Sequence, residues 1–214
     1  MRVNYREIVS GLTHLFAAIC AAFGWLWLLS ITRDNPSQMS VMFLYGLSLV
    51  MLFIASARLH LSQGTYEVMV RLRKFDHAAI YFAIGGTYTP LIVILIDGVW
   101  QWITLIAIWA ICLVGIYWKL RLLKGHESST ASTVIYVLVG WFAALCAPLW
   151  LPHVDIWTLM LLIAGGVVYS IGAVIFALER PNLGKHFGFH ELWHVLVMIA
   201  SLLHFIAISR LVIV

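Results

Sequence analysis

The chain has 214 residues, of which 63% are hydrophobic and 10% are charged, and its formal net charge at pH 7 is +4. Soluble domains are about 45–50% apolar and about 25% charged, and a domain of this size could not bury so much apolar surface in one core. The composition therefore excludes a soluble globular domain. It also excludes intrinsic disorder, which requires low hydrophobicity and high charge, and it indicates an integral membrane protein.

The apolar residues form seven runs, each long enough to cross a bilayer as a helix of about 20 residues. The predicted spans are residues 8–31, 39–61, 77–96, 102–120, 132–151, 156–178 and 189–213. The first run exceeds the apolar region of a secretory signal peptide, so we interpret it as a span. No linker is long enough to hold a second domain, and we expect one all-α, seven-helix transmembrane domain over residues 1–214.

The positions of the basic residues predict how the bundle lies in the membrane. Most Lys and Arg fall before the first span or after the second, fourth and sixth spans, whereas the opposite loops hold only Arg33. Because cytoplasmic loops retain Lys and Arg, this bias predicts a cytoplasmic N-terminus and, with seven spans, a C-terminus outside. No basic run alternates with exposed aromatic residues, so we expect no nucleic-acid partner.

Three groups of polar residues interrupt the apolar spans near their predicted cytoplasmic ends. One group ends the second span, and the others open the third and seventh spans: Ser56 with His60, Asp76 with His77, and His190 with His194. Ionisable residues in membrane segments are costly and are functional hypotheses by default. The predicted topology places all three groups at one depth on one side of the membrane.

The spacing of the histidines points to a metal site. His190 and His194 are four residues apart, so on a helix both rings lie on one face and can hold one ion. With His60 they supply three imidazoles and leave an open fourth position, the arrangement of a catalytic zinc that lowers the pKa of a bound water to about 7. Asp76 is the nearest carboxylate that could orient this water or take its proton. The three cysteines lie in apolar runs without close spacing and are interpreted as buried hydrophobes.

Other histidines allow alternatives. His14 and His204 are interpreted as interior histidines with satisfied hydrogen bonds, and His204 lies too far along its helix from His190 to share a metal. His186 is also four residues before His190, but glycines on either side of it favour a loop. A fourth protein ligand, either His77 or His186, would make the site closed and structural.

Residues 190–194 also match the His-Glu-x-x-His motif of soluble zinc peptidases, in which the Glu is the general base. This match leaves open a membrane metalloprotease with Glu191 as its base, although it covers only five residues. The alternative is a structural role for Glu191, because a negative charge is favourable at a helix N-terminus.

Taken together, several motifs resemble the bacterial hemolysin III proteins, a group related to the progestin and adipoQ receptors and more distantly to alkaline ceramidases. The motifs are Ser56-x-x-x-His60, residues 74–81 (KFDHAAIY), residues 86–90 (GTYTP), His190-x-x-x-His194, Glu7 followed by Thr13-His14, and residues 165–170 (GGVVYS). The resemblance covers essentially the full length of the chain. Two departures stand out. Glu191 replaces a residue that is often small and apolar, and residues 9–12 lack an Asn that is common in the family.

The resemblance implies a seven-helix bundle in a bacterial cell membrane, with the N-terminus inside and a zinc near the cytoplasmic face. The implied zinc ligands are His60, His190 and His194. Asp76 and Ser56 are implied as the groups around the zinc-bound water.

These observations together predict a zinc-dependent hydrolase acting on an amide or ester bond of a membrane lipid, similar to the ceramidase relatives. Zinc would polarise the carbonyl and supply hydroxide, Asp76 would act as base, and Ser56 would hydrogen-bond the oxyanion or the water. One alternative is a non-enzymatic membrane-homeostasis or sensor protein with a structural zinc. The other is a pore-forming cytolysin, although the spans lack the polar lining that a pore requires.

Overall fold

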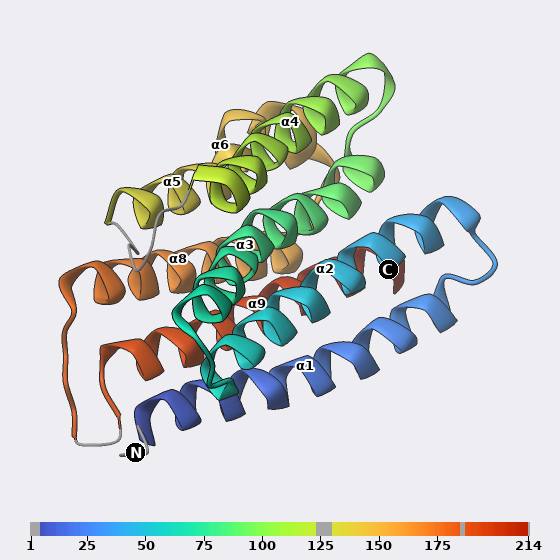
Figure 1. Ribbon diagram of the computed structural model, residues 1–214. Coiled ribbons are helices and arrows are strands. Elements are labelled where there is room, and N and C mark those ends of the chain that lie inside the picture. The colour runs from blue at the N-terminus through green and yellow to red at the C-terminus, as the bar shows by residue number, and fades with distance from the viewer. Residues whose placement is uncertain (1–4, 123–129, 185–186, 214) are drawn as a thin grey trace.

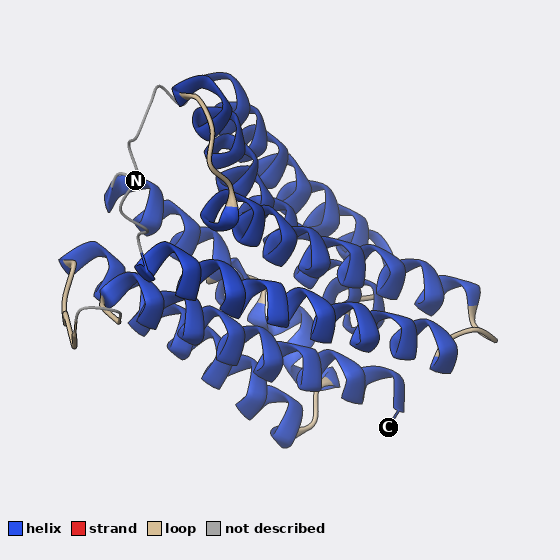
Figure 2. Cartoon of the chain, turned by 60° about the horizontal axis from the view of Figure 1, so that its bottom comes forward, coloured by secondary structure: helices blue, strands red, loops and turns tan. Residues whose placement is uncertain are grey.

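Helices make up nearly all of the structure, a computed structural model that describes residues 5–122, 130–184 and 187–213. In chain order the elements are α1 (Tyr5–Ile31), α2 (Pro36–Leu61), α3 (Tyr66–Leu95), α4 (Gly98–Leu122), α5 (Thr130–Gly140), α6 (Phe142–Leu145), α7 (Ala147–Trp150), the 3-10 turn η1 (Leu151–His153), α8 (Ile156–Leu178) and α9 (Phe189–Ile213). The described residues contain no strand, and short loops join most of the helices (Figure 2). The predicted all-α class is confirmed.

Six of these helices are long and apolar enough to cross a membrane: α1, α2, α3, α4, α8 and α9. Many large apolar side chains point outward from them, including Phe23, Ile106 and Val114. An apolar surface of this kind requires contact with lipid or with another protein, because its exposure to water is unfavourable in free energy. The chain is therefore an all-α membrane protein.

The predicted fifth span, residues 132–151, is not one continuous helix. α5 ends at Gly140, and the following elements are single turns. Tyr88 of α3 bridges the break, because its hydroxyl donates to the carbonyl oxygen of Gly140 (2.7 Å) and accepts from the N–H of Ala143 (2.8 Å). A break at membrane depth requires such partners for its freed backbone groups. The hydropathy of the segment did not reveal this interruption.

The third helix begins earlier than its apolar run indicated. The prediction started this span at residue 77, whereas α3 begins at Tyr66 with Thr65 as its N-cap. Three basic residues expected in a loop therefore lie on the first turns of this helix: Arg71, Arg73 and Lys74. Asp76 and His77 consequently lie well inside α3 and are not at its start.

Two polar contacts define the ends of the bundle. At the end where α1 and α9 begin, here called the N-terminal end, the Ser10 hydroxyl donates to Glu191 (3.2 Å). At the opposite end, Arg210 of α9 pairs with Asp155 (3.0 Å), which is the N-cap of α8. The hydrogen bond from the Thr158 hydroxyl and the other hydrogen bonds to the Asp155 carboxylate lower its pKa to about 2. The start of α1 and the end of α9 lie toward opposite ends of the bundle (Figure 1).

Small residues allow the closest helix contacts. A Cβ atom at Gly86 of α3 would lie 2.0 Å from the Ser48 hydroxyl oxygen of α2, and one at Gly165 of α8 would lie 2.2 Å from the ring of His204 in α9. Close approach through small residues is a common way for membrane helices to associate. These contacts hold α2 against α3 and α8 against α9, and a cavity remains between the two pairs.

Candidate metal centre and its cavity

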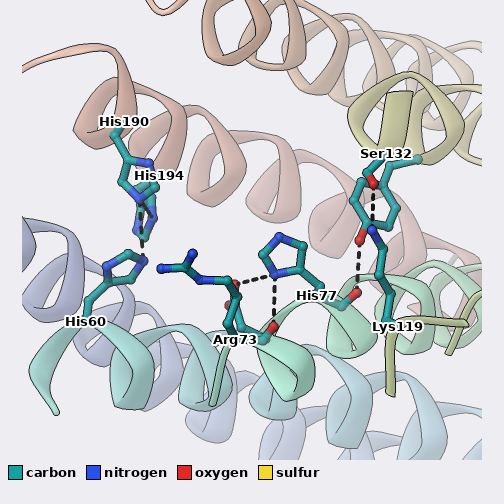
Figure 3. Close-up of polar contacts among 9 residues, drawn as sticks. His60, Arg73, His77, Lys119, Ser132, His190 and His194 are labelled. Carbon is teal, nitrogen blue, oxygen red and sulfur yellow. Dashed lines mark hydrogen bonds and ion pairs between the residues drawn. The ribbon is translucent and has the colours of Figure 1, made fainter. Parts of the chain in front are cut away.

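Three histidines from two helices converge at the N-terminal end of the bundle (Figure 3). His60 lies in the last turn of α2, and His190 and His194 lie on successive turns at the start of α9. The Nε2 atom of His190 lies 3.4 Å from Nε2 of His60 and 3.2 Å from Nε2 of His194. One ligand atom from each ring lies within 4.8 Å of the others, which makes the three residues a candidate metal-binding group.

The backbone of α1 fixes the orientation of the most buried of these rings. Nδ1 of His194 lies 3.2 Å from the carbonyl oxygen of Ser10. A carbonyl oxygen only accepts hydrogen bonds, so Nδ1 carries the proton and Nε2 keeps its lone pair. That lone pair faces His190, as is typical of an imidazole whose second nitrogen is held in place for metal binding.

His14 extends the cluster from α1. Its ring stacks on that of His194 with 3.9 Å between centroids, and its side chain is only 4% exposed. Neither ring nitrogen has a hydrogen-bond partner among the described residues, so the prediction of a satisfied interior histidine is wrong for His14. The same prediction is confirmed for His204, whose Nε2 lies 3.1 Å from the carbonyl oxygen of Leu162.

Asp76 approaches the cluster from α3. Its carboxylate is partly buried, lies 3.5 Å from Nδ1 of His77, and interacts electrostatically with His60 and His14. His77 also lies 2.9 Å from the carbonyl oxygen of Arg73, to which Nδ1 donates. His77 is therefore not part of the three-histidine group among the described residues, and His186, the other predicted fourth ligand, lies outside them.

Ser56 lies one turn before His60 on α2 and is buried. It lines a cavity of about 1300 Å³ together with Asp76, His14 and the three clustered histidines. The cavity follows α3 from Met69 to Leu95, and apolar side chains of α3 and α8 line most of its length beyond the histidines. The cavity therefore has one polar end and a long apolar body.

Glu191 is buried, and both of its carboxylate oxygens accept hydrogen bonds. Its side chain is 2% exposed, and one carboxylate oxygen accepts the N–H of Gly188 (2.7 Å) while the other accepts the Ser10 hydroxyl (3.2 Å). In the first contact, Glu191 at the third position of α9 accepts the backbone N–H of the N-cap residue Gly188, as a Glu does in a capping box. The second contact joins α9 to α1. These contacts favour the structural role over the peptidase-like role for Glu191.

Glu191 and Ser10 also connect the two departures from the hemolysin III pattern. Ser10 lies in the stretch 9–12 that lacks the common Asn, and its hydroxyl contacts Glu191. The Ser10 carbonyl oxygen in turn accepts from His194. Ser10 of α1 thus hydrogen-bonds both to Glu191 and to one of the candidate ligands. The sequence pattern at Ser10 or at Glu191 alone did not reveal this link.

The fold and the site define a multi-pass membrane protein with a three-histidine candidate metal site at one end of an apolar cavity. The chain belongs to the haemolysin-III related family, whose sequence profile matches residues 3–205. It is 29% identical over 204 residues to Hemolysin-3 of Bacillus cereus, covering 94% of this chain and 90% of the relative. It is 26% identical over 197 residues to the Hemolysin-3 homolog of Bacillus subtilis (strain 168), covering 90% and 87%.

The similarity extends beyond bacteria. The monocyte to macrophage differentiation factor of Homo sapiens is 24% identical over 221 residues, covering 96% of this chain and 84% of that protein. The matches to the haemolysin-III related family and to the bacterial Hemolysin-3, together with the six apolar helices, agree with a location in a bacterial cell membrane.

Proposed function

We propose that this protein is a zinc-dependent hydrolase that cleaves an amide or ester bond of a membrane lipid. The observation that carries the proposal is the placement of three converging imidazoles, a carboxylate and a serine at one end of a long apolar cavity. Such a cavity is suited to an acyl chain, and its polar end is suited to the bond that attaches this chain to the rest of the lipid.

The histidine geometry fits zinc. Two nitrogens held about 2.0–2.1 Å from one tetrahedral zinc are about 3.3–3.4 Å apart. The separations of 3.4 Å and 3.2 Å between the Nε2 atoms match this value. Imidazole ligands favour zinc over Mg²⁺ and Ca²⁺, which prefer oxygen, and three protein ligands leave a position for catalysis.

The proposal includes a topology of seven crossings with the N-terminus in the cytoplasm. α4 ends at the N-terminal end of the bundle and α8 begins at the opposite end, which supports a further crossing by the segment from α5 to η1 (Figure 1). Broken helices at membrane depth are tolerated where protein buries their backbone or where they line a cavity, and Gly140, Ala143 and Trp150 line this one. The basic residues at the N-terminal end support the orientation.

Each residue at the polar end has a proposed task. His60, His190 and His194 would hold the zinc, which would supply Lewis acidity for a carbonyl oxygen and lower the pKa of water. Asp76 takes the proton of the attacking water and later delivers it to the leaving group. Ser56 donates a hydrogen bond to the oxygen on which negative charge develops, and the apolar body of the cavity positions the acyl chain and excludes water.

The test measures, by mass spectrometry, the fatty acid that the purified protein releases in detergent. The probes are a ceramide, a diacyl phospholipid and a monoacylglycerol, each with zinc-loaded protein, with chelator-treated protein and after zinc is restored. We expect release from at least one lipid, its loss on chelation and its return with zinc. Zinc-loaded protein that releases fatty acid from none of them would contradict hydrolysis and favour a non-enzymatic protein with a structural metal.

A further inference from the structure

His204 places a polar ring in the lining of the apolar body of the cavity. It lies on α9 beyond His194, at a distance of about 15 Å along the helix. Its Nε2 lies 3.1 Å from the carbonyl oxygen of Leu162 on α8. A carbonyl oxygen only accepts hydrogen bonds, so Nε2 carries the proton and Nδ1 keeps a lone pair. His204 therefore contributes a hydrogen-bond acceptor far from the polar end of the cavity.

The packing of the ring turns this acceptor away from α8. A Cβ atom at Gly165 would lie 2.2 Å from Cδ2 and 2.4 Å from Nε2 of His204, so this edge of the ring lies against the α8 backbone. Nδ1 lies on the opposite edge, and it has no hydrogen-bond partner among the residues that the structure describes. The bond to Leu162 thus satisfies one ring nitrogen and leaves the other to a donor from within the cavity.

The hydroxyl groups of α3 and α8 that line the apolar body are engaged elsewhere. Three of them donate to backbone carbonyl oxygens of their own or a neighbouring segment, and the fourth lies beside the buried hydroxyl of Ser201. These contacts are Thr87 to Ala83 (2.8 Å), Tyr88 to Gly140 (2.7 Å), Ser170 to Gly166 (2.8 Å) and Tyr169 to Ser201 (2.7 Å). A water molecule is poorly held at a lone acceptor, because an ordered buried water uses about two to four polar partners.

We propose that His204 binds a hydroxyl group in the middle of the acyl chain of the lipid that occupies this cavity. A hydroxyl donates to a nitrogen lone pair, whereas a ketone oxygen only accepts. A chain whose carbonyl end lies at the clustered histidines brings its middle to His204, about 15 Å further along α9. The hydroxyl gives the buried acceptor the partner that it lacks, so the cavity favours a hydroxylated chain over a plain one.

The inference rests on the proposed function, since it assigns the cavity to an acyl chain with its carbonyl end at the histidines. It adds the class of lipid, one with a hydroxyl in the middle of the chain. It also makes His204 a residue that determines specificity without contact with the reacting bond, because His204 lies too far along α9 to reach it.

The experiment measures equilibrium binding of fatty acids to the full-length, zinc-supplemented protein in neutral detergent. Fatty acids are products of the proposed reaction and contain no bond that it cleaves, so binding is measured without turnover. The probes share one chain: oleate, ricinoleate (oleate with a hydroxyl in the middle of the chain), the analogue with a ketone in place of this hydroxyl, and the isomer with the hydroxyl at the far end of the chain.

Three variants accompany the wild type. His204→Phe keeps an aromatic ring and removes the acceptor, whereas His204→Gln keeps an N–H for the Leu162 carbonyl oxygen and an oxygen that accepts. The matched control is Tyr169→Phe, which removes the hydroxyl of the neighbouring ring, 5.6 Å from His204 between centroids, and leaves His204 unchanged. Thermal unfolding of each variant accompanies the binding curves.

We expect the wild-type protein to bind ricinoleate about three- to tenfold more tightly than oleate, the effect of one hydrogen bond to a buried acceptor. The ketone and the end-hydroxylated isomer should bind no more tightly than oleate. His204→Phe should remove the preference and leave the affinity for oleate within about twofold. His204→Gln should retain part of the preference, and Tyr169→Phe should retain it in full.

Equal wild-type affinities for oleate and ricinoleate, or an equal gain from the ketone, would overturn the proposal, even if both His204 variants failed to fold. A preference that persists in His204→Phe, or that disappears in Tyr169→Phe, would also overturn it. Because no cleavage is measured, the outcome is separate from that of the hydrolase proposal. A protein that prefers ricinoleate through His204 and hydrolyses no lipid would contradict only the hydrolase proposal.

Discussion

Replacing Asp76 by Asn is expected to lower lipid hydrolysis by about 10²–10⁴-fold, the usual contribution of a general base. The amide keeps the size of the carboxylate but cannot accept the proton of the attacking water. The three histidines are untouched, so the metal content should remain that of the wild type. Fatty-acid release and metal content, measured on the same preparation, separate these two effects.

The matched control is Asp97→Asn, which makes the same chemical change at an exposed position between α3 and α4. This variant should retain wild-type hydrolysis. Asp76→Asn with an undiminished rate would remove Asp76 from the mechanism. Loss of the metal in Asp76→Asn would instead assign Asp76 to metal binding.

Replacing Glu191 by Ala is expected to destabilise the protein by about 2–4 kcal/mol, because it removes a helix cap and leaves buried donors without partners. The affected donors are the N–H of Gly188 and the hydroxyl of Ser10. Chemical or thermal unfolding in detergent measures the loss. The control is Glu67→Ala, whose side chain is 81% exposed and which should change stability by less than about 0.5 kcal/mol.

Glu191→Gln distinguishes this structural role from the peptidase-like alternative. The amide oxygen can still accept the N–H of Gly188, so much of the stability should remain and zinc-dependent hydrolysis should stay near the wild-type rate. A loss of activity of about 100-fold in a well-folded Glu191→Gln variant would instead identify Glu191 as a general base.

The sequence was informative about the large-scale arrangement because hydropathy and charge act over whole helices. The apolar runs located the six long helices, and the succession of spans brought Ser56, His60, Asp76, His190 and His194 to one cavity. This proximity follows from topology alone, since His60 and His190 are 130 positions apart. Motifs scattered along the chain identified the family correctly.

The features that escaped prediction depend on single contacts between helices. Hydropathy could not reveal the break after Gly140, because the Tyr88 hydroxyl that bridges it comes from α3. It could not place Arg73 either, since the polar start of α3 resembles a loop when only apolar residues are counted. Lys119 is similar: it resembles a surface residue in sequence but is buried, and it donates to Ser132 of α5 (2.6 Å).

The contacts around His194 illustrate the same limit at the site. The i, i+4 spacing paired His194 with His190, but it gave no sign that His14 stacks on His194 or that Ser10 accepts its Nδ1 proton. Both residues lie on α1, which the Ser10 hydroxyl joins to Glu191 of α9. Such contacts are set by how two helices rotate and slide against each other, which a hydrophobic pattern does not specify.

Elemental analysis of the purified protein most directly tests the central claim, that His60, His190 and His194 hold one zinc. The comparison uses the wild type, the double variant His190→Ala, His194→Ala and the control His153→Ala, which removes an exposed histidine from η1. We expect about one zinc per chain in the wild type and in the control, and none in the double variant. Equal zinc in the double variant, or no zinc in a wild-type protein supplied with the metal, would contradict the account.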